Sequence, residues 1–278
     1  FENFIASIPF YGFASLCIDH PSVQKLLPAV SDRRVITYGL SANADVRAVN
    51  LRHEKGQMIF DVLLSDRLDI KIDRLDNVQF PMLGEHNVQN CLAAISICLE
   101  MAIDPEIILS GLRQFKGVGR RFDFKGETDG ITIIDDYGHH PVEIRAALSA
   151  GRMRAEQNKL IAVVQPHRYS RLRDLFSDFC TCFNDADHVV VADVYAAGED
   201  PIEGFEKEDL AKGLRAWGHR SVHVLSDPEA LAEQIDKLAS SGDLVMCLGA
   251  GTVTAWAAAL PKQLAELRNT PLVTEAGQ

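Results

Sequence analysis

The spacing of apolar residues changes part-way along the chain, near residue 117. Before that point the apolar stretches are short and interrupted by polar residues, as in RVITYGL, ADVRAVNLR, MIFDVLL and LDIKIDRL. This pattern predicts β-strands, and Lys55-Gly56 between the second and third stretches predicts a hairpin turn. In LDIKIDRL, residues 68–75, apolar and charged positions alternate, which predicts a half-exposed antiparallel strand.

Two helices are predicted after these strands. The first covers about residues 87–101. The second runs from Pro105 to about Phe115, with Asp104 as its N-cap and a proline in its first turn. The opening phrase FENFIASIPF has the pattern of an amphipathic helix that continues from an earlier segment, so we expect an N-terminal part to precede Phe1.

After residue 117, continuous apolar strands alternate with amphipathic helices. The predicted strands are GITIIDD, KLIAVVQP, HVVVADV, SVHVL and DLVMCLG, and helices such as PVEIRAALSAGRMRA, RLRDLFSDFCTCF and KEDLAKGLRAW separate them. Strands that are apolar throughout are buried on both faces, which is typical of a parallel sheet with helices on both sides. The predicted fold class is therefore α/β, with a doubly wound, Rossmann-like parallel sheet at 118–278 and a strand-and-helix domain at 1–117.

Composition restricts the partners of the chain. Of 278 residues, 47% are hydrophobic, and 28 basic against 39 acidic side chains give a net charge of −11. A negative protein repels phosphate backbones, which argues against extended contact with nucleic acid or an anionic membrane. An anionic ligand would therefore need a local cluster of Arg, His and backbone N–H groups.

Scattered cysteines without a C-x2-C pair predict buried thiols. The absence of a signal peptide or a long apolar segment in the sequence predicts a cytoplasmic protein.

The segment DDYGHHPVE directly follows the predicted strand GITII. Ligands of open α/β sheets bind beyond the carboxyl ends of the strands, so these residues are candidates for chemistry. Asp136 could hold a ribose hydroxyl or a metal-bound water, and His139 and His140 could hydrogen-bond a reacting group. A zinc site is the weaker interpretation, because no H-E-x-x-H or H-x-x-E-H pattern is present.

The segment QPHRYSR follows the predicted strand KLIAVV in the same way. Arg168 and Arg171 are one helical turn apart at a predicted helix N-terminus, which attracts anions. Together with His167 they form a predicted anion clamp. Cations at this position oppose the helix dipole, so a purely structural role explains them poorly.

Three further motifs carry weaker signals. Asn87 and Asn90 in GEHNVQN share one helical face, and side-chain amides suit a purine edge, although ordinary helix capping explains them as well. Arg120 and Arg121 in GVGRRF could bind a phosphate or a ribose at the domain junction, or could simply be solvated. The glycine turn GAGT, residues 249–252, could admit a ligand to backbone N–H groups or could be only a tight turn.

These motifs, in this order and spacing, resemble the ATP-dependent Mur ligases of peptidoglycan synthesis over essentially the whole chain. DDYGHHPVE and QPHRYSR are similar to the motifs of those members that add L-alanine to UDP-N-acetylmuramate. The resemblance implies the later part of a central ATP-binding domain at 1–117 and the family's C-terminal domain at 118–278. It also implies the reaction, in which ATP and Mg²⁺ convert the muramoyl carboxylate to an acyl phosphate that the amino group of L-alanine attacks.

The resemblance also implies roles for individual residues. His86, Asn87 and Asn90 match the adenine-side motif, and Arg121 and Asp136 match residues that reach the nucleotide. The positions that face L-alanine and the reacting carboxyl or phosphate are matched by Tyr137, His139, His167, Arg168 and Arg171. No metal ligand is predicted among the residues of this chain.

One family motif has no counterpart in the sequence, which contains no G-x-x-G-K-[ST] segment to cradle β- and γ-phosphates. We expect the Mg²⁺ ligands and the UDP-binding domain to lie outside this chain as well, so that the chain is the remainder of a ligase and is inactive alone. A peptide-recycling ligase that uses the same nucleotide sugar and a non-catalytic nucleotide-binding module stay open as alternatives. A nicotinamide dehydrogenase is disfavoured, because no G-x-G-x-x-G follows the first strand of the parallel domain.

Overall fold

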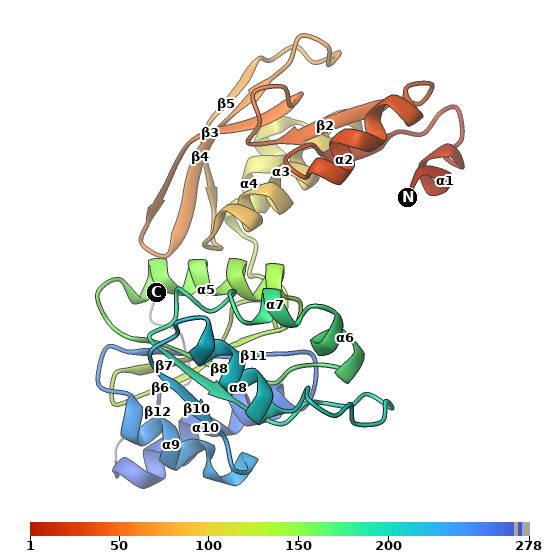
Figure 1. Ribbon diagram of the computed structural model, residues 1–278. Coiled ribbons are helices and arrows are strands. Elements are labelled where there is room, and N and C mark those ends of the chain that lie inside the picture. The colour runs from red at the N-terminus through yellow and green to blue at the C-terminus, as the bar shows by residue number, and fades with distance from the viewer. Residues whose placement is uncertain (270–271, 274–278) are drawn as a thin grey trace. The chain divides into compact units, whose positions relative to one another are not determined.

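The structure, a computed structural model, describes residues 1–269 and 272–273. The chain forms two compact units, Phe1–Lys116 and Gly117–Gln278, which we call the N-terminal and C-terminal units. In the part that the structure describes, each unit contains one sheet with helices packed against it (Figure 1).

The sheet of the N-terminal unit has the strand order β1-β2-β3-β4-β5. β2 pairs in parallel with β1 and β3, whereas β4 pairs antiparallel with β3 and β5. The strands are β1 (Ala14–Cys17), β2 (Val35–Gly39), β3 (Val46–Glu54), β4 (Gln57–Leu64) and β5 (Arg74–Phe80). The helices are α1 (Glu2–Ala6), α2 (Pro21–Leu26), a 3-10 turn (Leu27–Val30), α3 (Glu85–Glu100) and α4 (Pro105–Arg113), and α3 and α4 pack against the sheet.

Two local predictions for the N-terminal unit, a hairpin turn and a helix cap, agree with the structure. The hairpin at Lys55-Gly56 is confirmed, because both residues have the positive φ that a two-residue turn between twisted strands requires. Asp104 caps α4 as predicted, since its carboxylate accepts the N–H of Glu106 at 2.8 Å.

The strand predicted at 68–75 is wrong, because β5 begins only at Arg74. Its alternating residues lie mostly in the connection after β4, where backbone N–H groups bond within the loop. Leu68 donates to Ser65 at 3.0 Å and Ile70 donates to Leu68 at 2.9 Å. Hydrogen bonds within the loop thus occupy the backbone groups that would have paired with a neighbouring strand in the predicted β-structure.

The sheet of the C-terminal unit has the order β10-β9-β8-β11-β7-β6-β12 among the described residues. The five strands from β10 to β7 run parallel, as predicted. The strands are β6 (Asp123–Thr128), β7 (Ile131–Asp136), β8 (Leu160–Val164), β9 (His188–Val191), β10 (Val222–Val224), β11 (Leu244–Leu248) and β12 (Leu272–Val273). The helices are α5 (Pro141–Ala155), α6 (Tyr169–Asp174), α7 (Phe176–Phe179), α8 (Lys207–Ala216), α9 (Leu231–Leu238) and α10 (Val253–Arg268), with a 3-10 turn at Pro228–Ala230.

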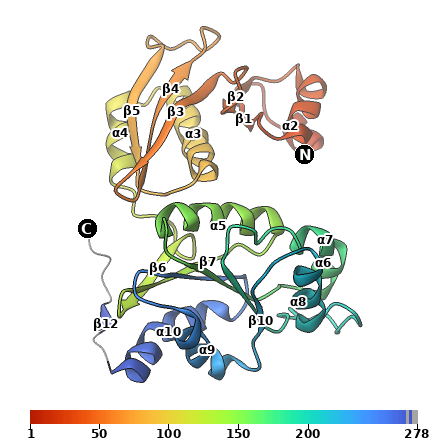
Figure 2. The same ribbon diagram turned by 60° about the vertical axis from the view of Figure 1, so that its left-hand side comes forward.

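Helices cover both faces of this sheet, as the continuous apolar strands predicted. In β8, Ala162 and Val164 pack with α5, α6, α7 and α8, whereas Ile161 and Val163 pack with α9 and α10 on the other face. Figures 1 and 2 show α5 on one side of the sheet and α9 and α10 on the other. The predicted α/β, doubly wound fold class is confirmed.

Two details of this unit differ from the prediction. β6 runs antiparallel to β7, and β12 pairs antiparallel with β6, so the sheet is mixed at one edge (Figure 2). β6 escaped prediction because its sequence DFKGET is polar and contains the glycine at its bulge. The helix predicted over RLRDLFSDFCTCF is broken into α6 and α7 at Leu175, whose φ and ψ are −118° and 21°.

The edge of the sheet at the start of β9 and β10 makes a pH-dependent contribution to stability. Ser221 Oγ lies 2.7 Å from His188 Nδ1 and 3.0 Å from His223 Nε2. Burial is the main reason why the pKa of each histidine is lowered. A histidine with a lowered folded pKa binds fewer protons than in the unfolded chain, so stability rises with pH up to the ordinary histidine pKa of about 6.5.

We therefore expect the free energy of unfolding of the C-terminal unit to fall as pH is lowered from about 7 to 5. In His223→Gln, which keeps a polar side chain beside Ser221, this dependence should be weaker than in the wild type. Urea titrations at several pH values measure both slopes. Equal slopes in the two proteins would show that His223 does not contribute.

Candidate active site

The candidate site lies at the carboxyl ends of β7, β8, β9 and β11. β8 and β11 are parallel neighbours, but the chain leaves β8 toward α6 on one face and leaves β11 toward α10 on the other. The two connections diverge and open a crevice, which is the usual binding position of a doubly wound sheet. The predicted motifs DDYGHHPVE and QPHRYSR both begin at this edge.

Four ring side chains from three loops lie side by side here: two histidines, His139 and His167, flanked by Tyr137 and Tyr195. We call these four residues the imidazole cluster. The ring centroids of Tyr137 and His139 are 5.1 Å apart, those of His139 and His167 are 5.8 Å apart, and those of His167 and Tyr195 are 5.4 Å apart. The fold thus brings the histidines of the two predicted motifs together, although 27 positions separate them in the sequence.

Hydrogen bonds fix opposite proton positions on the two histidines. His139 Nδ1 lies 2.9 Å from the Tyr137 carbonyl, which can only accept, so Nδ1 carries the proton and Nε2 of the neutral ring is an acceptor. His167 Nδ1 lies 3.2 Å from Arg171 Nη1, which can only donate, so Nε2 of His167 carries the proton. Burial, followed by the charge of Arg171, lowers the pKa of His167, which is therefore neutral at pH 7. The two histidines thus present one acceptor and one donor.

The two arginines of the predicted clamp differ in their surroundings. Arg171 Nη1 also donates to the His167 carbonyl at 3.0 Å, which ties the start of α6 to the loop before it. Arg168 has φ 73° and ψ 130°, a conformation that costs a non-glycine residue on the order of 1–3 kcal/mol. Its side chain is 51% exposed, so the guanidinium is accessible to an anion. Strain of this kind persists only where neighbouring contacts enforce it.

Tyr195 and Glu199 complete the site and were missed by the sequence analysis. Tyr195 forms a parallel bridge with His167, and its carbonyl accepts the N–H of Arg168 at 2.8 Å. Glu199 accepts hydrogen bonds from Ser170 N at 2.9 Å and Ser170 Oγ at 2.7 Å. The signal that could have found both residues is the one used for the other loops, because the segment YAAGED, residues 195–200, directly follows the predicted strand HVVVADV.

The carboxylate of Asp136 is occupied by hydrogen bonds from the backbone of the C-terminal unit. Its two carboxylate oxygens accept the N–H groups of Gly138 and Phe122, each at 2.8 Å, and the residue is only 6% exposed. Burial raises the pKa of this carboxyl although both hydrogen bonds act to lower it. Its predicted contact with a nucleotide stays a prediction.

The adjacent arginines of GVGRRF have different surroundings. Arg120 Nη2 donates to the Gly249 carbonyl at 2.8 Å, and its guanidinium lies 4.7 Å from the centre of the Tyr137 ring. Arg121 lies over the same ring at 5.4 Å and is 43% exposed. Arg120 therefore anchors the start of the C-terminal unit, whereas Arg121 is accessible to a ligand.

His140 and the asparagine motif contribute to helix starts. His140 Nδ1 accepts the N–H of Val142 at 3.3 Å and caps α5, so a structural role accounts for this histidine. In the N-terminal unit, His86, Asn87 and Asn90 lie in the first turns of α3. Asn87 is buried and its amide donates to the Leu83 carbonyl at 2.8 Å, so a bond to the chain just before α3 occupies part of its hydrogen-bonding capacity. The adenine contact of this motif stays a prediction.

The glycines of GAGT allow the ends of β8 and β11 to approach closely. Gly249 has a φ of +150°, and a Cβ atom there would lie 2.7 Å from the Gln165 carbonyl oxygen. Gly249→Ala should therefore destabilise the C-terminal unit by about 1–3 kcal/mol, measured by urea unfolding. Gly119→Ala is the matched control, because nothing lies within 4 Å of its Cβ position, and it should change stability by less than about 0.5 kcal/mol. Equal stability of both variants would contradict the steric explanation.

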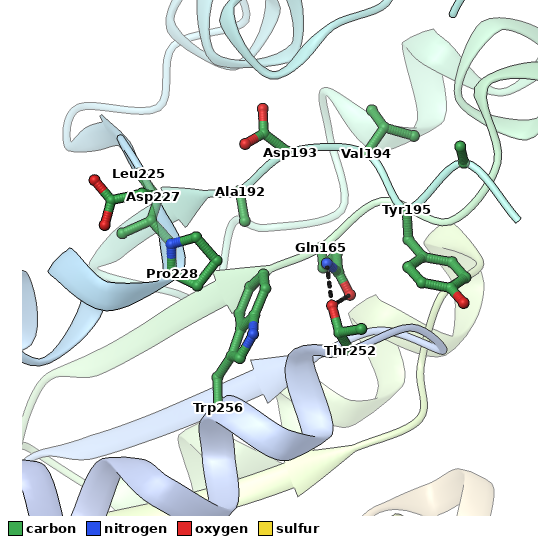
Figure 3. Close-up of a pocket in the computed structure, with 11 residues that line it drawn as sticks. Gln165, Ala192, Asp193, Val194, Tyr195, Leu225, Asp227, Pro228, Thr252 and Trp256 are labelled. Atoms are coloured by element: carbon green, nitrogen blue, oxygen red, sulfur yellow. Dashed lines mark hydrogen bonds between the residues drawn. The ribbon is translucent and has the colours of Figure 1, made fainter. Parts of the chain in front are cut away.

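A cavity of about 260 Å³ adjoins the imidazole cluster on the α10 side. Figure 3 shows Trp256 and Pro228 at one side of it, Tyr195 at the other, and a hydrogen bond between Gln165 and Thr252. Tyr195 belongs to both the cavity and the cluster.

No helix among residues 1–269 is long and apolar enough to cross a membrane. Nowhere in the described part of the chain do three His, Cys, Asp or Glu side chains gather as a metal site requires. All six cysteines are free thiols, and four of them are buried.

Comparison with known proteins places this fold and its motifs in one family. The model of the Mur ligase middle domain matches residues 1–98, and that of the Mur ligase glutamate ligase domain matches residues 120–251. The chain belongs to the Mur ligase family. The resemblance stated from its motifs is confirmed.

The most similar relatives share more than half of the aligned residues. The UDP-N-acetylmuramate–L-alanine ligase of Rhodospirillum rubrum is 57% identical over 264 residues, which are 95% of this chain and 55% of the relative. The enzyme of the same name from Gluconacetobacter diazotrophicus is 54% identical over 278 residues, which are 100% of this chain and 58% of the relative. This Mur ligase chain thus spans about half the length of the curated relatives it matches.

Solved structures share the fold at low identity. The UDP-N-acetylmuramate-alanine ligase of Thermotoga maritima matches with a TM-score of 0.70 and 21% identity, over 96% of this chain and 61% of that one. A murein peptide ligase of Psychrobacter arcticus matches with a TM-score of 0.63 and 20% identity, over 95% of this chain and 53% of that one. These matches agree with the predicted α/β fold class.

Proposed function

We propose that this chain is part of a cytoplasmic ATP-dependent ligase that joins L-alanine to UDP-N-acetylmuramate through an acyl phosphate, in peptidoglycan synthesis. The observation that carries this proposal is the imidazole cluster with Arg171, in which two motifs similar to those of L-alanine-adding ligases meet at one edge of the sheet. Relatives that carry this name and are more than half identical support the choice of L-alanine over a peptide.

The amino group of L-alanine must lose a proton to attack. His139 Nε2 accepts that proton, because Nδ1 is already committed to the Tyr137 carbonyl and lies 3.4 Å from the Glu143 carboxylate. The same carboxylate stabilises the imidazolium that forms. In catalytic triads, too, an acceptor binds Nδ1–H of the histidine and so orients Nε2 to take the proton. The Tyr137 carbonyl and the Glu143 carboxylate have this position relative to His139.

Negative charge develops on the acyl phosphate and on the tetrahedral intermediate that follows it. Arg168, Arg171 and the Nε2–H of His167 bind this charge, since oriented donors stabilise charge where it forms. His167 acts here as a neutral donor beside the two guanidinium groups. The three residues proposed to bind this charge all belong to the C-terminal unit.

ATP supplies the phosphoryl group. Arg121, which is exposed beside the Tyr137 ring, fits a contact with the nucleotide, and His86, Asn87 and Asn90 are proposed for the adenine. Among the described residues, no group of three His, Cys, Asp or Glu side chains could hold Mg²⁺ on protein ligands alone, so no step is assigned to a metal here. We expect the isolated 278-residue chain to be inactive, because its sequence contains no segment that cradles the β- and γ-phosphates.

The complete protein tests the proposal. Phosphate release from ATP and UDP-N-acetylmuramate is measured with L-alanine and, separately, with L-Ala-γ-D-Glu-diaminopimelate. We expect turnover with L-alanine and none with the peptide. Turnover with the peptide alone would assign a recycling ligase, and binding of both nucleotides without turnover would assign a binding module.

A further inference from the structure

The loop after β9 holds the loop after β8 in place through main-chain contacts. Tyr195 N donates to the Pro166 carbonyl at 2.8 Å, and Arg168 N donates to the Tyr195 carbonyl at 2.8 Å. These bonds enclose the isolated parallel bridge between His167 and Tyr195. The backbone of the predicted clamp is therefore fixed from a segment about 30 residues later in the sequence.

Glu199, in the middle of that later loop between β9 and α8, contacts the clamp through its side chain. Both carboxylate oxygens accept hydrogen bonds from Ser170, and Oε1 lies 3.8 Å from Arg168 Nη1. The N-cap of α6 is Arg168, whose own side chain makes no capping bond, so Glu199 supplies the cap from outside the helix. These hydrogen bonds hold the pKa of Glu199 below its usual range, which keeps the carboxylate charged.

This contact explains how Arg168 keeps its unfavourable backbone conformation. A non-glycine residue at φ 73° keeps this conformation only when several contacts hold it there. The Tyr195 carbonyl accepts the N–H of Arg168. Glu199 binds Ser170, two residues further on, and attracts the guanidinium of Arg168. At 3.8 Å the ion pair is long, and the guanidinium stays half exposed. Glu199 can therefore orient Arg168 without using up its hydrogen-bonding capacity.

We propose that Glu199 is a positioning residue, which acts through Arg168 to hold its guanidinium where the anionic intermediate forms. This inference rests on the proposed function. It predicts that Glu199→Ala in the complete ligase lowers kcat/KM for L-alanine about 10- to 100-fold, as a displaced catalytic group does, and leaves the KM for ATP within about twofold. Asp200→Ala, an exposed carboxylate next in the chain, is the matched control and should match the wild type.

A double-mutant cycle separates positioning from a general structural role. If Glu199 acts through Arg168, then Glu199→Ala should change kcat/KM by less than about threefold in an Arg168→Ala background. The inference would be overturned if the losses of kcat/KM in the two single variants multiply in the double variant. It would also be overturned if Glu199→Ala lowers the melting temperature but keeps wild-type kinetics. Should Glu199→Ala fail to fold, Glu199→Gln, which keeps an acceptor for Ser170, enters the same cycle.

The outcomes also separate this inference from the proposed function. Wild-type kinetics in Arg168→Ala would overturn the positioning role, while turnover of L-alanine by the unmodified ligase would leave the function in place. A complete protein that never uses L-alanine would contradict the function itself and remove the inference with it.

Discussion

His139→Ala in the complete ligase is expected to lower kcat by about 10²- to 10⁴-fold, the usual contribution of a positioned general base. The structure gives the reason, because Nδ1 of His139 is held by the Tyr137 carbonyl and Nε2 is the acceptor that remains. The KM for ATP should stay within about twofold, since the proton that His139 accepts comes from the amine. Steady-state kinetics with L-alanine and ATP varied in turn measure both effects.

The neighbouring histidine offers a matched control. His140→Ala removes the cap of α5, which should cost about 1 kcal/mol of stability but leave kcat within a few-fold. A variant of His139 with wild-type kcat would remove this residue from the chemistry. Equal losses of kcat in both variants would instead point to a disturbed loop.

The positions of the site loops could be predicted because they depend on topology. Continuous apolar strands such as KLIAVV and HVVV can only be buried on both faces, and a parallel arrangement then places the residues after each strand at one edge. For this reason the rings of His139 and His167, at that edge, lie with their centroids 5.8 Å apart.

Side-chain partners could not be predicted, because they depend on contacts between distant segments. The two histidines are neighbours in the sequence, yet His139 faces His167, a contact that no local pattern predicts, whereas His140 caps α5 just before Pro141. The carboxylate of Asp136 accepts backbone N–H groups from Phe122, on the other side of β6, and from Gly138, and only the first of these partners is distant in the sequence. Strand 68–75 failed for the opposite reason, because its local alternation is clear but loop hydrogen bonds take its backbone groups.

Arg171→Ala should have the second large effect, a fall in kcat/KM for L-alanine of about 10²- to 10³-fold, as removal of an oriented donor to a developing anion causes. Arg171 has two functions in the site. Its guanidinium binds charge directly, and its bond to His167 Nδ1 keeps the proton of His167 on Nε2. Arg171→Lys keeps the charge but lacks the planar fork, so it should recover only part of the activity. Arg173→Ala, an exposed arginine on the same helix that pairs with Asp174, is the matched control and should keep wild-type kinetics.

The same variant also has a readout that does not require turnover. Next to burial, the positive charge of Arg171 is the largest cause of the lowered pKa of His167. Loss of that charge should therefore raise the pKa of His167 toward its ordinary value, and an NMR titration of the 278-residue chain measures the change. A shift of this pKa together with wild-type kinetics would place Arg171 beside His167 but outside the reaction. Lost activity without a shift would instead mean that the guanidinium of Arg171 is not held beside His167, because the loss of a charge 3.2 Å from a histidine must alter its titration.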